Sequence, residues 1–120
     1  MKKKLAEAPK QVSISALRQE LRRGTLVLAV LAVLRDERHG AEVREMLTAG
    51  GVAIDDGALY PMLRRLEDQG LLRSDWRFEG SRNKRFYMLA PHGLDTFKQL
   101  VEEWREQTEG VERLIRKEQP

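Results

Sequence analysis

Residues 55–70 read DDGALYPMLRRLEDQG and carry the clearest structural pattern in the chain. Its apolar side chains recur at helical spacing and form one stripe: Leu59, Met62, Leu63 and Leu66. Asp55 or Asp56 can cap the start of a helix, and Gly70 can stop it. The pattern predicts an amphipathic helix over Ala58–Gly70, with one face committed to a core.

The opposite face of this helix carries a different set of side chains: Ala58, Tyr60, Pro61, Arg64 and Arg65. Arginine offers paired donors to guanine or phosphate, and tyrosine can contact a thymine methyl group or donate to phosphate. In a helix-turn-helix, the first half of the second helix enters the major groove. We expect a reading surface over 58–65 only, because Glu67 and Asp68 would repel phosphates. An ordinary amphipathic surface helix would show the same pattern.

Two helices are expected upstream. The first is predicted over Ser15–Arg35, capped by Ser13 or Ser15, with a second half that is apolar on most sides and therefore central to a core or an interface. The second is predicted over His39–Ala49, before the helix-ending pair Gly50-Gly51.

Two strands are expected downstream, over Leu71–Phe78 and Arg85–Leu89, joined by a projecting loop over 79–84. Basic and amide side chains gather there: Arg77, Arg82, Asn83, Lys84 and Arg85. A basic hairpin directly after a two-helix unit is the layout of a wing, whose cations can reach phosphates or the minor groove. The alternative is a hairpin whose charges only confer solubility.

A long last helix is predicted over Pro91–Arg116. Its apolar positions alternate in spacing between three and four, the coiled-coil interval: Leu94, Phe97, Val101, Trp104, Thr108, Val111 and Ile115. We expect a seam between two copies of the chain, formed by Leu17, Leu21, Phe97, Val101, Trp104, Thr108 and Val111. Two facing Trp104 indoles would form a flat slot for a planar aromatic ligand. Plain packing of the dimer core is the alternative.

Composition narrows the class of protein. The 120 residues include no cysteine, which excludes disulfides and thiol chemistry, and the longest apolar run, Leu26–Leu34, is too short to span a bilayer. Residues 1–24 carry a net charge of +5 and residues 71–90 carry +3, whereas residues 102–118 carry −2. This asymmetry favours a polyanionic partner on one face, although ordinary solvated charge remains open. We expect a cytoplasmic location.

Enzymatic chemistry has no candidate residues. His39 and Glu42 are three apart and could coordinate a metal, but a capping contact is the simpler interpretation. The glycines lack the lysine and hydroxyl residue of a phosphate-binding loop. No cofactor, metal site or catalytic residue is therefore predicted.

The chain resembles the PadR family of bacterial transcriptional regulators over roughly residues 17–115. The resemblance rests on Gly24-Thr25-Leu26, His39-Gly40, the stretch from Gly57 to Glu67 with Gly70-Leu71, Trp76, and the stretch from Arg85 to Gly93. It implies a dimeric winged helix that usually represses transcription at inverted-repeat operators, with Tyr60, Pro61 and Arg64 on DNA and Arg82, Lys84 and Arg85 assisting.

The single last helix resembles the short subgroup of that family, some of whose members bind aromatic drugs in a dimer pore beside a tryptophan that Trp104 matches. Two positions depart from the family pattern. Ala41 stands where tyrosine is common, which puts a contact with the DNA backbone in doubt, and Ala90 stands where threonine is favoured as a helix cap.

Taken together, the sequence predicts a mostly α protein with a small β-hairpin wing, a winged helix-turn-helix followed by a dimerisation helix. Residues 1–14 are expected to form a flexible basic arm, 15–90 the DNA-binding domain and 91–117 the dimerisation helix. The expected function is a homodimeric regulator of transcription, a repressor with a planar aromatic effector as candidate ligand. A winged-helix module that binds proteins rather than DNA is the alternative, and the sign of regulation, the operator and the effector stay open.

Overall fold

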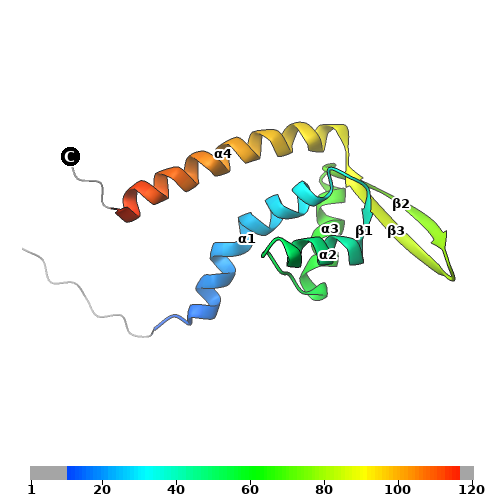
Figure 1. The fold of residues 1–120 in the computed structure, drawn as a ribbon, viewed down its shortest axis with the longest axis horizontal. Helices are drawn as coiled ribbons and strands as arrows, with labels where there is room; N and C mark the ends of the chain where they lie inside the picture. The colour runs from blue at the N-terminus through cyan, green and yellow to red at the C-terminus, as the bar shows by residue number, and fades with distance from the viewer. Residues whose placement is uncertain (1–10, 117–120) are drawn as a thin grey trace, which may run out of the picture.

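The computed structural model describes residues 11–116, which form four helices and one small antiparallel sheet (Figure 1). The elements follow in the order α1 (Ile14–Val33), β1 (Arg38–His39), α2 (Gly40–Ala49), α3 (Asp56–Asp68), β2 (Leu72–Glu79), β3 (Arg82–Leu89) and α4 (Pro91–Arg116). The predicted fold class is confirmed, and α4 has the predicted bounds.

The core lies where the apolar half of α1 meets the inner stripe of α3. Val30, Leu31 and Leu34 at the end of α1 are fully buried. They pack in one cluster with side chains from α2, α3 and the sheet: Val43, Leu47, Leu59, Met62, Leu63, Leu66, Leu72, Tyr87 and Leu89. The burial of the predicted stripe leaves the other face of α3 exposed to solvent.

Side-chain caps set where the helices begin. The hydroxyl of Ser13, not that of Ser15, accepts from the first amides of α1, so α1 begins at Ile14. The carboxylate of Asp55 accepts from the Ala58 amide at 2.9 Å, so α3 begins at Asp56, two residues before the predicted start, and it ends at Asp68 rather than Gly70. Each cap satisfies an amide that has no partner within its helix.

The hairpin differs from the prediction. The expected loop over 79–84 is wrong, because β2 and β3 pair as far as Glu79 and Arg82 and leave only Gly80 and Ser81 as the turn. Gly80 has a φ of 64°, a backbone conformation that glycine adopts without strain and that tight hairpin turns require. The wing is therefore a continuous ladder to its tip, and Arg82, Asn83 and Lys84 lie on a strand.

A third strand was not predicted. The two residues of β1 pair with β3, Arg38 opposite Tyr87 and His39 opposite Phe86, which gives the sheet order β1-β3-β2. The pairing ties the turn after α1 to the wing. Two residues are too few to show an alternating pattern in a sequence.

The wing and the free ends of α1 and α4 lie at opposite ends of the molecule (Figure 1). The predicted basic arm falls mostly outside the described residues, as does the end of the predicted dimerisation segment at Lys117. Within residues 11–116, no helix is long and apolar enough to cross a membrane.

Candidate nucleic-acid interface

A groove of about 540 Å³ runs between α3, the start of α2 and the wing. Tyr60 and Arg64 of α3 line one wall, and Arg82, Asn83, Lys84 and Arg85 of β3 line the other, with His39, Gly40, Ala41, Trp76 and Tyr87 completing it. The fold thus brings six of the predicted DNA-binding residues into one groove.

The remaining predicted residues of α3 lie elsewhere. Ala58 and Arg65 line a second groove, of about 710 Å³, whose other wall is α1 with Arg22 and Arg23. Pro61 is exposed and lines neither groove. The outer face of α3 therefore has a wing side and an α1 side.

The ring of Tyr60 is only partly exposed because it lies against the start of α2. A Cβ atom added to Gly40 would come within 2.4 Å of the Tyr60 ring, so a larger residue at this position would displace the ring. An ion pair between Arg44 of α2 and Asp56 of α3, at 2.6 Å, joins the two helices a second time. The hydrogen bond within this pair, from Arg44 to Asp56, raises the pKa of Arg44 above its ordinary value. These contacts fix how α3 projects from the domain.

Arg85 is held by its own chain. Its guanidinium donates to Glu67 Oε1 at 2.8 Å and to Ser74 Oγ at 3.0 Å, while the Ser74 hydroxyl donates to Glu67 Oε2 at 2.6 Å. The same guanidinium lies over the rings of Trp76 and Tyr87. We call this triad of Glu67, Ser74 and Arg85 the wing clamp, because it joins the end of α3 to both strands of the wing.

The other cations of the wing differ in how far they are engaged. Arg77 lies on the same face of the hairpin as Lys84 and Arg82; it pairs with Glu37 and Asp75 and covers the ring of Phe86. Lys84 lies 3.8 Å from Glu79, a loose contact. Within residues 11–116, Arg64 and Arg82 form no ion pair within 4 Å. Arg64 and Arg82 are thus available to an anionic ligand of the groove.

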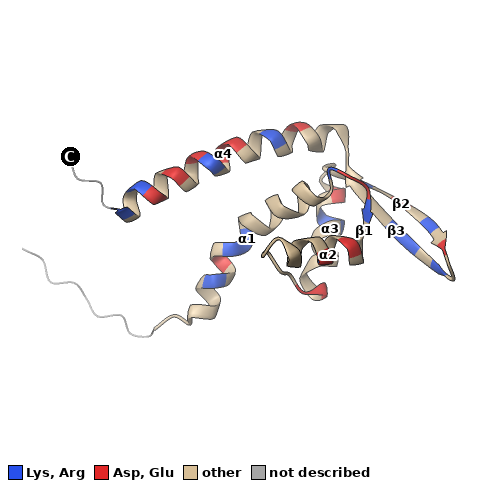
Figure 2. Ribbon diagram, viewed as in Figure 1, with Lys and Arg blue, Asp and Glu red and all other residues tan. Residues whose placement is uncertain are grey.

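Charge is distributed unevenly along the molecule (Figure 2). Basic residues outnumber acidic ones along the wing and along the first half of α1, whereas acidic and basic residues alternate along α4. The neutral Tyr87 lies beneath the groove, where burial raises the pKa of its hydroxyl above the ordinary value. The excess of basic residues therefore lies on the wing and on the first half of α1.

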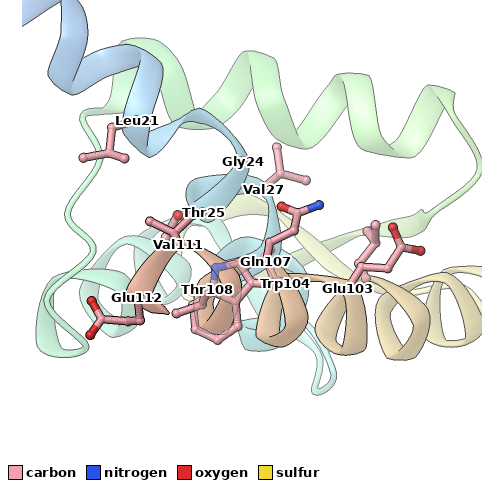
Figure 3. Close-up of a pocket in the computed structure, with 12 residues that line it drawn as sticks. Leu21, Gly24, Thr25, Val27, Glu103, Trp104, Gln107, Thr108, Val111 and Glu112 are labelled. Carbon is pink, nitrogen blue, oxygen red and sulfur yellow. The ribbon is translucent and has the colours of Figure 1, made fainter. Parts of the chain in front are cut away.

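A third groove, of about 590 Å³, separates the free halves of α1 and α4. Trp104, Thr108 and Val111 of α4 line it, together with Leu21 of α1 (Figure 3). The exposed fractions are 80% for Leu21, 43% for Trp104 and 53% for Val111, which is high for apolar side chains. Leu17, half exposed on the same helix, lies outside the groove.

The first part of the predicted seam is covered within the single chain. Phe97 is half-buried against the core, and the guanidinium of Arg35 lies 5.7 Å from the centre of its ring. Val101 is also half-buried and lines, with Trp104, a smaller neighbouring groove between α1 and α4. The exposed part of the seam thus begins at Trp104.

Sequence reasoning missed three residues that line these grooves: Arg22, Arg23 and Trp76. The sequence did point to Arg22 and Arg23 as part of the positive charge of residues 1–24. Their position beside α3 depends on how α1 and α3 cross, which the sequence does not show. Trp76 is one of the residues of the family resemblance, but its position in the groove follows from the register of the hairpin.

The histidine that could have ligated a metal has a capping role. The His39 amide donates to Glu42 Oε1 at 3.0 Å, and the His39 ring meets Phe86 edge-on. Within the described part of the chain, no three histidine, aspartate or glutamate residues are grouped so that they could hold a metal ion.

Comparison with known proteins gives a consistent result. A model of the "Transcriptional regulator PadR-like family" matches residues 27–99. The chain is 38% identical over 76 residues to the transcriptional regulator Rv3488 of Mycobacterium tuberculosis, a match that covers 62% of this chain and 71% of the relative.

Solved structures agree with that match. The crystal structure of a PadR family transcriptional regulator from Eggerthella lenta superposes with a TM-score of 0.78 at 38% identity, over 85% of this chain and 91% of the other. A Streptococcus transcriptional regulator superposes with a TM-score of 0.70 at 26% identity, over 79% and 96%.

Proposed function

Because this chain belongs to the PadR-like family of transcriptional regulators, we propose that it is a homodimeric repressor that binds an inverted-repeat operator. It is a DNA-binding regulator rather than an enzyme. The observation that carries the proposal is the groove in which Tyr60 and Arg64 of α3 face the cations of the wing.

In this proposal, α3 enters the major groove with Ala58, Tyr60, Pro61, Arg64 and Arg65. Arg64 is the main base-reading residue, because its guanidinium is exposed and has no ion pair within the described residues, and it can donate twice to a guanine. Arg65 faces the α1 side of the helix and contacts a phosphate together with Arg22 and Arg23.

The wing follows the neighbouring DNA backbone. Arg82, Asn83 and Lys84 contact phosphates or the minor groove, which makes binding steeply dependent on salt. Arg85 takes a different part: since its guanidinium is already bound to Glu67 and Ser74, we assign it to positioning the wing rather than to the DNA.

Dimerisation uses the exposed apolar surface of α1 and α4. In the proposed dimer, Trp104, Thr108 and Val111 of one copy pack with the other copy's Leu17 and Leu21 around a two-fold axis. Burial of these side chains contributes about 25 cal/mol for each Å² of apolar surface removed from water. Two recognition helices then meet half-sites about one helical turn apart.

The effector is proposed to be a planar aromatic cation in the groove beside Trp104. The indole offers a flat apolar face, and Glu103 and Glu112 line the same groove and supply negative charge (Figure 3). A ligand that binds one arrangement of the two copies more tightly shifts the dimer toward it and changes the spacing of the recognition helices. Release from the operator follows from that change.

The double variant Tyr60→Ala/Arg64→Ala tests the reading surface. We expect specific binding to fall by at least about a hundredfold, because a bidentate base contact contributes about 1–3 kcal/mol and the loss occurs in both half-sites. The measurement is the affinity for a duplex selected from a random pool by the unaltered protein. The oligomeric state should not change, since both residues lie far from α4.

The matched control is Arg73→Ala, an exposed arginine on β2 that lines neither groove beside α3. This variant should bind the selected duplex nearly as tightly as the unaltered protein. Unchanged affinity in the double variant would contradict the assignment of the reading surface.

A further inference from the structure

An unusual apolar side chain lies at the tip of the wing. Phe78 is 72% exposed and stands two residues before the turn glycine, Gly80. Trp76, which is 58% exposed, lies on the same side of the hairpin because side chains alternate along a strand. Two large aromatic side chains on one face of a projecting hairpin form a surface that a monomer has no reason to keep exposed.

The dimer seam does not account for this surface. The wing points away from the free ends of α1 and α4 (Figure 1), so a second copy packed on Trp104 and Val111 leaves the wing tip uncovered. Trp76 is partly covered within its own chain, since the Arg85 guanidinium lies 5.5 Å from the centre of its ring. In residues 11–116, Phe78 has no such ring or cation contact.

The neighbours of Phe78 match a nucleic acid. Asn83 is directly opposite on β3 and shares its face, while Arg82 and Lys84 flank Asn83 along β3 with side chains that start from the other face of the hairpin. Asparagine can hydrogen-bond to the acceptors that every base pair shows in the minor groove, and the two cations can contact the flanking phosphates. Asn83 and Trp76 also line the groove that contains Tyr60 and Arg64, so the aromatic face is continuous with the proposed reading surface.

We propose that Phe78 is a specificity-determining residue that enters the minor groove beside the half-site read by α3. This inference rests on the proposed function. The phenyl ring offers no hydrogen bond, so its contribution comes from packing on the sugars and from partial unstacking of a base step. Unstacking is easiest at pyrimidine–purine steps, and the side chain therefore selects such a step in the flank of each half-site. Phe78 thus contributes to sequence recognition without a hydrogen bond to a base.

The experiment compares sequences selected from random duplexes by the unaltered protein and by Phe78→Ser and Phe78→Leu. We expect the core of the half-site to stay the same in all three. The flanking TA or CA preference should be lost in Phe78→Ser and kept in part by Phe78→Leu, which retains an apolar side chain. On a selected duplex, replacing the flanking TA step by AA should weaken the unaltered protein about tenfold and Phe78→Ser less than twofold.

A direct measurement of unstacking uses 2-aminopurine in place of the adenine of the flanking step. Its fluorescence should rise when the unaltered protein binds and stay low with Phe78→Ser at saturation. Arg82→Ala is the matched control on the wing: it should weaken binding to all flanks alike and lower the salt slope by about two units, one for each copy in the dimer, with the flanking preference unchanged.

The outcomes separate the two proposals. If the unaltered protein enriches no sequence, the proposed function fails and this inference fails with it. If it enriches a half-site but Phe78→Ser retains the same flanking preference and the same 2-aminopurine signal, only the role of Phe78 is overturned. Thermal unfolding should be unchanged by either substitution, because the side chain is exposed.

Discussion

The molecule has a wing end and a seam end, the latter formed by the free halves of α1 and α4. The two ends differ in whether the contacts within a single chain complete the surface. At the wing end, Glu67, Ser74 and Arg85 bind one another and hold the hairpin against α3, so the surface is formed before any ligand arrives. At the seam end, Leu21, Trp104 and Val111 remain largely exposed along two diverging helices. The difference supports the two proposed roles, DNA binding at the wing end and dimerisation at the seam end.

The largest effect is expected from a charge at the seam end. Val111→Glu should prevent dimerisation, because a carboxylate buried between two copies without a partner costs several kcal/mol. Operator affinity should fall by at least about a hundredfold as the two half-sites lose their link. Sedimentation equilibrium and operator titration measure the two effects.

Gln99→Glu is the matched control, since it places the same charge at an exposed position of α4 outside the predicted seam. It should leave the dimer intact. A Val111→Glu protein that sediments as a dimer and binds the operator normally would show that the seam end is not an interface.

An intermediate effect is expected from the wing clamp. Glu67→Gln and Arg85→Lys should each lower the free energy of unfolding by about 1 kcal/mol, because the pair is partly buried and its hydrogen bonds are charge-assisted. Both should weaken operator binding by about three- to tenfold through a loosened wing, with the salt slope retained. Chemical denaturation and operator titration at several salt concentrations are the measurements.

Asp68→Asn is the control for removing one carboxylate from the same end of α3. It should change neither the free energy of unfolding nor the operator affinity appreciably, since Asp68 is exposed and forms no ion pair within residues 11–116. If Arg85→Lys weakened binding while Glu67→Gln left it unchanged, Arg85 would be a DNA contact after all, as the sequence predicts.

The smallest effect is spectroscopic and concerns the groove beside Trp104. In a Trp76→Phe background, Trp104 is the only tryptophan, so its fluorescence reports on the groove alone. A planar cationic dye should quench this emission in a saturable manner, and Glu103→Gln/Glu112→Gln should weaken the binding about threefold by removing two attractive charges.

Quenching equal to that of free tryptophan amide at the same dye concentration would remove the effector proposal. An uncharged dye of similar shape serves as the control for electrostatic attraction. The affinity of this uncharged dye should not change with the glutamine substitutions.

Much of the fold could be predicted, because helical periodicity is strong here. The stripe from Leu59 to Leu66 and the bounds of α4 follow from spacing and from Pro91, each a local property of the chain. The hairpin turn was predicted wrongly because the polar run from Glu79 to Lys84 has the composition of a loop, while Gly80 alone permits a tight turn. Composition did not distinguish a six-residue loop over 79–84 from a tight turn at Gly80 and Ser81.

The site was less predictable than the fold. Tyr60, Arg64, Arg82 and Lys84 could be named from charge and element order, since a winged helix places such residues near one another. The engagement of Arg85 could not, because Glu67 lies 18 residues earlier and nothing local marks the pair. The split of α3 into a wing side and an α1 side likewise depends on how α1 crosses the domain.

Local pattern accounts for the helices, the apolar stripe that α3 buries and the signs of charge along the chain, because these depend on residues at most a few turns apart. The folded molecule was needed to show which cations remain available, how far the ladder of the wing extends and which aromatic side chains stay exposed. These properties depend on contacts between residues far apart in the chain, and such contacts form only when the core brings the elements together.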